Sequence, residues 1–269
     1  MRLITDAWNR LPSRRRLWPL TALAVFITGL WSWQGVVAAL EGRWLYVLFY
    51  VPGAIAWLSA WYPAYEVYRH RGADYGSDRN TVARTNDGIA FRQSRRIHVL
   101  TAVSIFTIVL ACAVFAVGTW TDRLSFPMSR SQEAVFGVLA AILAVWYTVT
   151  GIWFLLGWAR FPTVECTPTA IRSRRFLSSQ QISWDEVVGV SAVADSKNAS
   201  IHLLTSENDV PHHWFGPALP RAKSGPFICP ADLLGVGTIR LLEFLDHYSI
   251  DPDARSELAD GRAIDRALT

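Results

Sequence analysis

The chain has 269 residues, of which 51% are hydrophobic and only 18% are charged, fewer than the quarter that is usual in soluble domains. Its formal net charge is only +4, and no clustered basic face or nucleic-acid-binding module is present, which argues against nucleic acid as a partner. Three cysteines without a CxxC pair argue against a disulfide framework and a zinc site.

The first apolar segment follows a short basic stretch. Leu17–Leu40 contains no charged residue and is long enough to cross the ~30 Å hydrocarbon core of a bilayer as a helix. A signal peptide is the alternative, because Val37-Ala38-Ala39 resembles a cleavage site. The length of the segment and the apolar segments that follow it favour a retained transmembrane helix.

Three further spans are expected at about 44–63, 99–120 and 134–158. None of the four contains an Asp, Glu, Lys, Arg or His, the residues that proton relays and ion pathways normally need. The sequence therefore predicts a four-helix transmembrane domain over residues 1–160 that acts as an anchor. In the last span, small residues at spacings of four, three, four and three predict a helix-packing face: Gly137, Ala141, Ala144, Thr148 and Gly151.

The distribution of arginine predicts the orientation of the spans. Five arginines precede residue 17, seven lie in the loop Glu66–Ile97 and four in Arg160–Arg175, whereas the other two loops hold one and two. Because basic residues concentrate on the cytoplasmic side, both termini and the loop 66–97 are expected to be cytoplasmic. The expected location is the cell inner membrane.

The loop 66–97 has a pattern of its own. Two alternating runs around Asn86-Asp87-Gly88 predict a β-hairpin over 81–92, which should pair with another strand because a lone hairpin is marginal in water. Residues 81–89 also match 163–171 without a gap, with Thr, Val, Thr and Ile coinciding. Two hypotheses remain open: a duplicated unit of two spans plus a hairpin, or a chance similarity.

The pattern after Phe161 is one of short strands and then helices. Turn residues separate candidate strands at 163–166, 170–176, 181–184, 187–193 and 200–204. Thr238–Tyr248 has a helical apolar face, and Asp251-Pro252 is typical of the start of a helix over 253–259. Residues 161–269 are therefore expected to form an α+β domain.

The run TPTAIRSRRFLSSQQISWDEVVGV resembles the opening of bacterial pleckstrin-homology-like (PH-like) domains, as found in actinobacterial integral membrane proteins. The residues that carry this resemblance are Ile171, Arg172, Ile182, Trp184 and Val187. It implies a curved seven-stranded sheet or barrel that is closed by a C-terminal helix. Such domains are not enzymes as a class. The proline-rich segment 205–227 departs from the family pattern.

Two groups of residues in this domain are candidate binding residues. Arg172, Arg174 and Arg175 lie close behind the last span and are candidates for anionic lipid headgroups, or are a topology signal only. His212, His213, Trp214 and Phe215 are candidates for contact with a partner or the membrane interface. A metal site that includes His202 is disfavoured because no acidic or cysteine ligand has suitable spacing. Trp184 is expected in the core.

The sequence contains no nucleophile elbow, phosphate-binding glycine loop, HExxH motif or carboxylate pair that would define a catalytic site. The expected function is therefore that of a non-enzymatic scaffold or regulator without a cofactor. Its cytoplasmic domain is expected to bind a protein, a peptide or anionic lipid headgroups, and the chain could form a homo-oligomer. The alternative is a channel or transporter subunit that the PH-like domain regulates.

Overall fold

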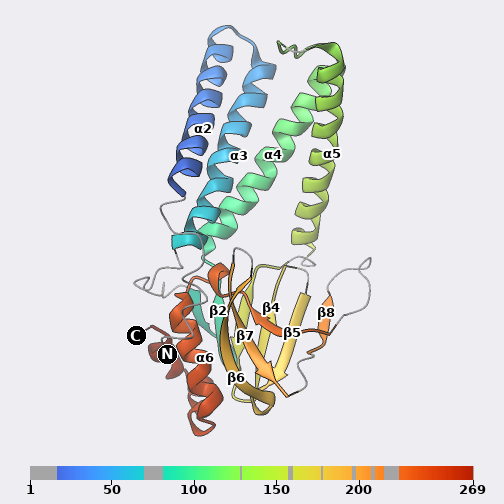
Figure 1. Cartoon of the computed structure of the whole chain (residues 1–269). Helices are drawn as coiled ribbons and strands as arrows, with labels where there is room; N and C mark the ends of the chain where they lie inside the picture. Colours follow the sequence, from blue (N-terminus) through green and yellow to red (C-terminus); the bar gives the residue numbers. More distant parts are fainter. Residues whose placement is uncertain are drawn as a thin grey trace. The chain divides into compact units, whose positions relative to one another are not determined.

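The structure is a computed structural model that describes residues 17–69, 81–127, 129–156, 160–176, 178–195, 198–206, 210–214 and 224–268 (Figure 1). The chain divides into two compact units. Arg15–Tyr65 and Arg96–Gly157 form a helical unit, and the segments Glu66–Arg95 and Trp158–Thr269 belong to a second unit that contains the strands. The hairpin segment thus belongs with the C-terminal part of the chain, although it lies between two long apolar helices in the sequence.

The helical unit contains four long helices: α2 (Leu17–Leu40), α3 (Trp44–Arg69), α4 (Arg95–Trp120) and α5 (Arg130–Leu155). All four are long and apolar enough to cross a membrane. The helix α2 has the bounds expected from the sequence, whereas α3 and α4 extend by some residues into polar sequence. A helix can continue past its apolar segment because intrahelical hydrogen bonds, and not hydrophobicity, define its ends.

The helix α5 begins one turn before its expected start at residue 134, because a capping box forms in the preceding loop. The Ser129 side chain accepts a hydrogen bond from the Gln132 backbone N–H, and the Gln132 side chain accepts one from the Ser129 N–H. This pairing stabilises a first turn made of polar residues.

Aromatic rings connect the helices at the end that carries the loop 121–129. The ring centroids of Phe49 and Phe115 are 5.3 Å apart, and those of Phe115 and Phe126 are also 5.3 Å apart. The Tyr46 hydroxyl donates a hydrogen bond to the Ser125 carbonyl at 2.9 Å. These contacts join α3, α4 and the loop that follows α4.

The second unit contains two antiparallel sheets (Figure 1). The strands of the six-stranded sheet, in spatial order, are β1 (Val82–Arg84), β2 (Ile89–Arg92), β3 (Thr163–Cys166), β4 (Ala170–Arg174), β5 (Ser178–Ser183) and β8 (His212–Trp214). The three-stranded sheet has the order β6 (Val187–Asp195), β7 (Asn198–Thr205) and β9 (Phe227–Cys229).

The sheets are open, so the barrel included in the expected fold is wrong. After β5 the chain passes through a 3₁₀ turn, η3 (Trp184–Glu186), into β6, which starts the second sheet. Among the described residues no backbone ladder joins the two sheets. Side chains connect them instead: Ser173 donates to the Ile228 carbonyl at 2.8 Å, and Gln180 donates to the Pro226 carbonyl at 2.9 Å.

The predicted hairpin is confirmed, and β2 pairs with β3 over its whole length. Ile89 and Phe91 are fully buried, and the Phe91 ring meets the Phe244 ring edge-on at 4.9 Å between centroids. Gly235 donates from its backbone N–H to the Arg92 carbonyl at 3.1 Å. The hairpin is therefore an integral part of the second unit.

The hairpins β1–β2 and β3–β4 have the same register. Val82 lies opposite Phe91 as Val164 lies opposite Ser173, and each of the other pairs in the first hairpin has its counterpart in the second. The turns also match: Thr85 N–H donates to the Gly88 carbonyl at 2.8 Å, and Thr167 N–H to the Ala170 carbonyl at 2.9 Å. This equivalence, which extends the sequence match of 81–89 with 163–171, is the geometry expected of a duplicated unit.

The helix α6 (Thr238–Ile250) packs its apolar face on the core of this unit. Leu241, Leu245 and Tyr248 are fully buried there. Trp184 is buried as expected, and its indole N–H donates to the Thr167 carbonyl at 2.7 Å. The α6 face therefore covers apolar residues that both sheets contribute.

Short helical segments flank α6. The segment η4 (Ala231–Leu233) precedes it, and η5 (Asp253–Arg255), α7 (Ser256–Asp260) and α8 (Ala263–Leu268) follow it. Asp251 caps the first turn after α6 as predicted, because its Oδ1 accepts hydrogen bonds from the Asp253 and Ala254 N–H groups at 3.1 and 3.2 Å.

Candidate functional site

The outer face of the six-stranded sheet carries most of its exposed polar side chains. Because side chains alternate along a strand, Ile89, Phe91, Val164 and Ile171 fill the core, and their neighbours point outward. Two cross-strand rows follow from the register. One runs Ala90, Glu165, Arg172, Gln181 and the next runs Arg92, Thr163, Arg174, Ser179, His213.

Three arginines therefore share this face, and only one has an acidic partner among the described residues. The Arg174 guanidinium lies 3.4 Å from a carboxylate oxygen of Glu165, which is on the neighbouring strand. The side chains of Arg92 and Arg172 are exposed, and neither forms an ion pair within the described part of the chain. Arg92 comes from the hairpin and Arg172 from β4, so two distant segments build the site.

A polar hollow of about 640 Å³ lies on this face. The turns of both hairpins border it through Thr85, Asn86, Asp87 and Thr167, and the strands contribute Arg84, Arg92, Glu165, Arg172 and Gln181. Arg84 donates a hydrogen bond to the Ala259 carbonyl at 3.1 Å. The short side chain of Ala170 also lines the hollow. Guanidinium groups at such a site can bind phosphate or carboxylate oxygens through two parallel hydrogen bonds.

Arg175 does not belong to this site. It follows the last residue of β4, is half-buried, and its guanidinium lies 3.5 Å from the Ile228 carbonyl of β9, to which it donates. The three arginines that the sequence groups together are therefore separated, because strand alternation sends Arg172 and Arg174 outward and the strand ends before Arg175.

The second group of candidates lies at the edge strand β8. His213 is exposed and lies opposite Ser179 in the ladder between β5 and β8. His212 and Trp214 belong to the same strand, with side chains outside the described residues, and Phe215 lies outside them altogether. Within the described residues, no three His, Cys, Asp or Glu side chains come close enough to hold a metal ion.

The small residues of α5 lie in several environments. Gly137 is buried against α4, where an added Cβ would lie 2.8 Å from the Thr119 hydroxyl, and an added Cβ at Gly151 would touch Ile105 at 3.6 Å. Ala141 and Ala144 are half-buried. Thr148 is exposed and donates its hydroxyl to the Ala144 carbonyl of its own helix.

Two free thiols lie beneath the site, in the core. Cys166 and Cys229 are fully buried, and burial raises the pKa of the Cys229 thiol to about 12 and that of Cys166 well above its ordinary value. Buried thiols with a raised pKa are poor nucleophiles, so both are structural groups.

Arg92 is one of the site residues that are missing from the candidates chosen from the sequence. The signal for it is the match between 81–89 and 163–171, because continuing this alignment places Arg92 on Arg174. Glu165 has no comparable signal, since its pairing with Arg174 depends on the register between β3 and β4.

Comparison of the chain with protein-family models, with curated proteins and with solved structures finds no match.

Proposed function

We propose that the protein is a non-enzymatic, membrane-anchored scaffold or regulator that binds the phosphate of anionic lipid headgroups at the outer face of its six-stranded sheet. The observation that carries this proposal is the pair of exposed arginines, Arg92 and Arg172, at one polar hollow. Each basic residue near an anionic leaflet contributes about 1 kcal/mol of attraction.

The covalent structure supports a location of the site near the bilayer. Arg92 ends β2 and α4 starts at Arg95, so their Cα atoms can be separated by at most about 11 Å of extended chain. The apolar part of α4 follows within one turn, at Val99. This short covalent connection to a proposed transmembrane helix supports a role for Arg92 near the headgroup layer.

The orientation in this proposal follows from the arginine-rich segments. These segments support an orientation with both termini and the sheet unit on the cytoplasmic side of the cell inner membrane, where anionic lipids create a negative surface potential. The succession of antiparallel strands followed by helix α6 supports the proposed resemblance to PH-like domains. An acidic peptide of a protein partner would use the same guanidinium groups, and the experiment below separates it from a lipid.

The test measures binding of short-chain phosphatidylglycerol to the purified full chain in a neutral detergent. We expect Arg92→Gln with Arg172→Gln to weaken this binding about tenfold, because two contributions of about 1 kcal/mol are partly screened. Arg262→Gln is the matched control, since this exposed arginine pairs with Asp260 in the segment between α7 and α8.

Equal binding by the double variant and the control would contradict the proposal. Short-chain phosphatidylcholine, which is zwitterionic and has no net charge, serves as the neutral probe and should bind both proteins equally weakly. If a poly-glutamate peptide binds the unaltered chain more tightly than phosphatidylglycerol does, the ligand is a protein and the lipid proposal is wrong.

A further inference from the structure

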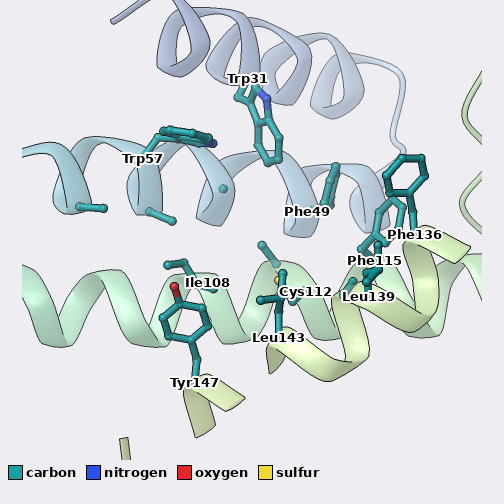
Figure 2. Close-up of a pocket in the computed structure, with 15 residues that line it drawn as sticks. Trp31, Phe49, Trp57, Ile108, Cys112, Phe115, Phe136, Leu139, Leu143 and Tyr147 are labelled. Carbon is teal, nitrogen blue, oxygen red and sulfur yellow. The ribbon is translucent and has the colours of Figure 1, made fainter. Parts of the chain in front are cut away.

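An apolar pocket of about 670 Å³ lies within the helical unit (Figure 2). It shares no lining residue with the hollow on the six-stranded sheet. Its lining residues are Trp31 of α2, residues between Phe49 and Ala60 of α3, residues between Ile108 and Phe115 of α4, and residues between Phe136 and Tyr147 of α5. None of the lining residues is charged. Figure 2 shows Trp31 and Phe49 on one side of the pocket and Cys112 and Leu143 on the other.

The pocket lies between the two helix pairs. The first pair, α2 and α3, precedes the hairpin β1–β2, and the second pair, α4 and α5, precedes the hairpin of identical register, β3–β4. In membrane proteins built from repeated units, binding sites commonly lie at the interface between the repeats. The position of this pocket agrees with that rule.

Small residues create the space and aromatic residues form its walls. Gly53, Ala56 and Ala60 lie on one side of α3, and Ala111 and Ala140 face them from α4 and α5. Gly53 is required for one wall, because an added Cβ would collide with the Trp31 ring. The aromatic contact of Phe49 with Phe115 closes one end of the pocket.

The chemistry of the lining selects the ligand. The lining side chains offer one polar atom on each of the four helices: the indole nitrogens of Trp31 and Trp57, the Cys112 sulfur and the Tyr147 hydroxyl oxygen. The rest of the lining is apolar, which favours a hydrocarbon over ordered water, since a buried water needs two to four polar partners around one point. We propose that the pocket binds one hydrocarbon chain of a membrane lipid. This inference rests on the proposed membrane insertion and not on the sheet site.

The length of the pocket favours a lipid chain over a helix of a second copy. Phe49 and Ala60 are separated by about 16 Å along α3. This is about half of the ~30 Å hydrocarbon core that a transmembrane helix must cross. A hydrocarbon chain, which occupies one leaflet of the bilayer, matches this length.

The experiment fills the pocket and measures the lipid that stays bound. The full chain is purified in detergent, washed extensively, and its retained phospholipid is quantified by mass spectrometry of an organic extract. Ala60→Phe projects a ring into the pocket from an exposed position, and Ala111→Phe does so from α4. Ala113→Phe is the matched control, because Ala113 is exposed on α4 and does not line the pocket.

We expect about one retained lipid per chain for the unaltered protein and for Ala113→Phe, and a several-fold loss for Ala60→Phe. If Ala111→Phe fails to fold, the lipid retained by Ala60→Phe alone tests the proposal. Equal retention in all variants would overturn the proposal, and so would a change of oligomeric mass on Ala60→Phe, which would identify a second copy as the occupant. Release of the protein from membranes by alkaline carbonate would instead show that the proposed membrane anchoring fails.

Discussion

At the scale of single residues, the sheet site depends on which guanidinium groups are neutralised. Glu165 lies opposite Arg172 in the ladder and forms an ion pair with Arg174, with both side chains of the pair about one quarter exposed. One carboxylate therefore lowers the positive potential around two arginines. Arg92, which comes from another segment, retains its full charge at the hollow.

Replacing Glu165 should strengthen anion binding. In Glu165→Gln the charge is removed and the shape is kept, so Arg174 becomes available as a third cation, and we expect short-chain phosphatidylglycerol to bind about fivefold more tightly. The measurement is a titration of the full chain in neutral detergent, with Glu186→Gln as a control in the 3₁₀ turn η3. Weaker binding by Glu165→Gln would mean that the carboxylate itself contacts the ligand.

The buried thiols predict how stability depends on pH. The pKa of Cys229 is raised in the folded chain from 9.0 to about 12, so the unfolded state loses this proton first. The stabilisation is complete below about pH 9 and is lost as the pH rises toward 12, at about 1.4 kcal/mol per unit.

Denaturant unfolding at pH 8 and pH 10.5 tests this dependence. The free energy of unfolding should fall by about 2 kcal/mol more in the unaltered chain than in Cys229→Ala, which lacks the ionisable group. An identical fall in both proteins would show that the Cys229 thiol is not protected from ionisation.

At the scale of elements, the hairpin β1–β2 depends on a close approach to β3. An added Cβ at Gly88 would lie 2.1 Å from the Cys166 carbonyl oxygen, a backbone atom that cannot move without the strand. Gly88 is therefore required for two reasons: it belongs to the turn after β1, and its lack of a side chain lets β3 approach closely.

Gly88→Ala should lower the free energy of unfolding of the sheet unit by about 1–3 kcal/mol, because the added methyl group must push β2 and β3 apart. Gly189→Ala in β6 is the matched control, since its added Cβ would meet only Leu204, at an ordinary 3.8 Å. Chemical denaturation followed by tryptophan fluorescence reports both. Equal stability of the two variants would show that the hairpin does not pack on β3 as described.

The local patterns predicted many elements because the decisive information lies within a few residues. Alternation around Asn86-Asp87-Gly88 predicted β1 and β2, and Asp251-Pro252 predicted the start of η5. Long-range pairings carry no such signal. The ladder between β2 and β3 joins segments on either side of α4 and α5, and the side-chain bonds of Ser173 and Gln180 to the β9 segment depend on how two sheets meet.

The candidate site was predictable in part for the same reason. Strand alternation alone could have placed Arg172 and Arg174 on one face and excluded Arg175. Arg92 required the additional step of treating the two hairpins as neighbours in one sheet. The short side chain of Ala170 borders the hollow, and this role appears only when the register is known.

At the scale of the whole molecule, the chain passes several times between the two units. The strands β1 and β2 lie between α3 and α4, and the remaining strands follow α5. A fragment that starts at residue 161 would therefore lack two strands and the buried side chains of Ile89 and Phe91. Binding experiments need the full chain.

We propose that four membrane-spanning helices hold the sheet face at the cytoplasmic surface of the bilayer, and cysteine labelling in intact cells tests this proposal most directly. Gln181→Cys presents a thiol on the exposed sheet face, and Arg123→Cys presents one in the loop between α4 and α5. The native thiols of Cys166 and Cys229 are buried, and the half-buried Cys112 of α4 is replaced by serine in both variants to remove its background.

A membrane-impermeant maleimide should label Arg123→Cys in intact cells and Gln181→Cys only after the inner membrane is permeabilised. Labelling of Gln181→Cys in intact cells, with Arg123→Cys protected, would contradict the account.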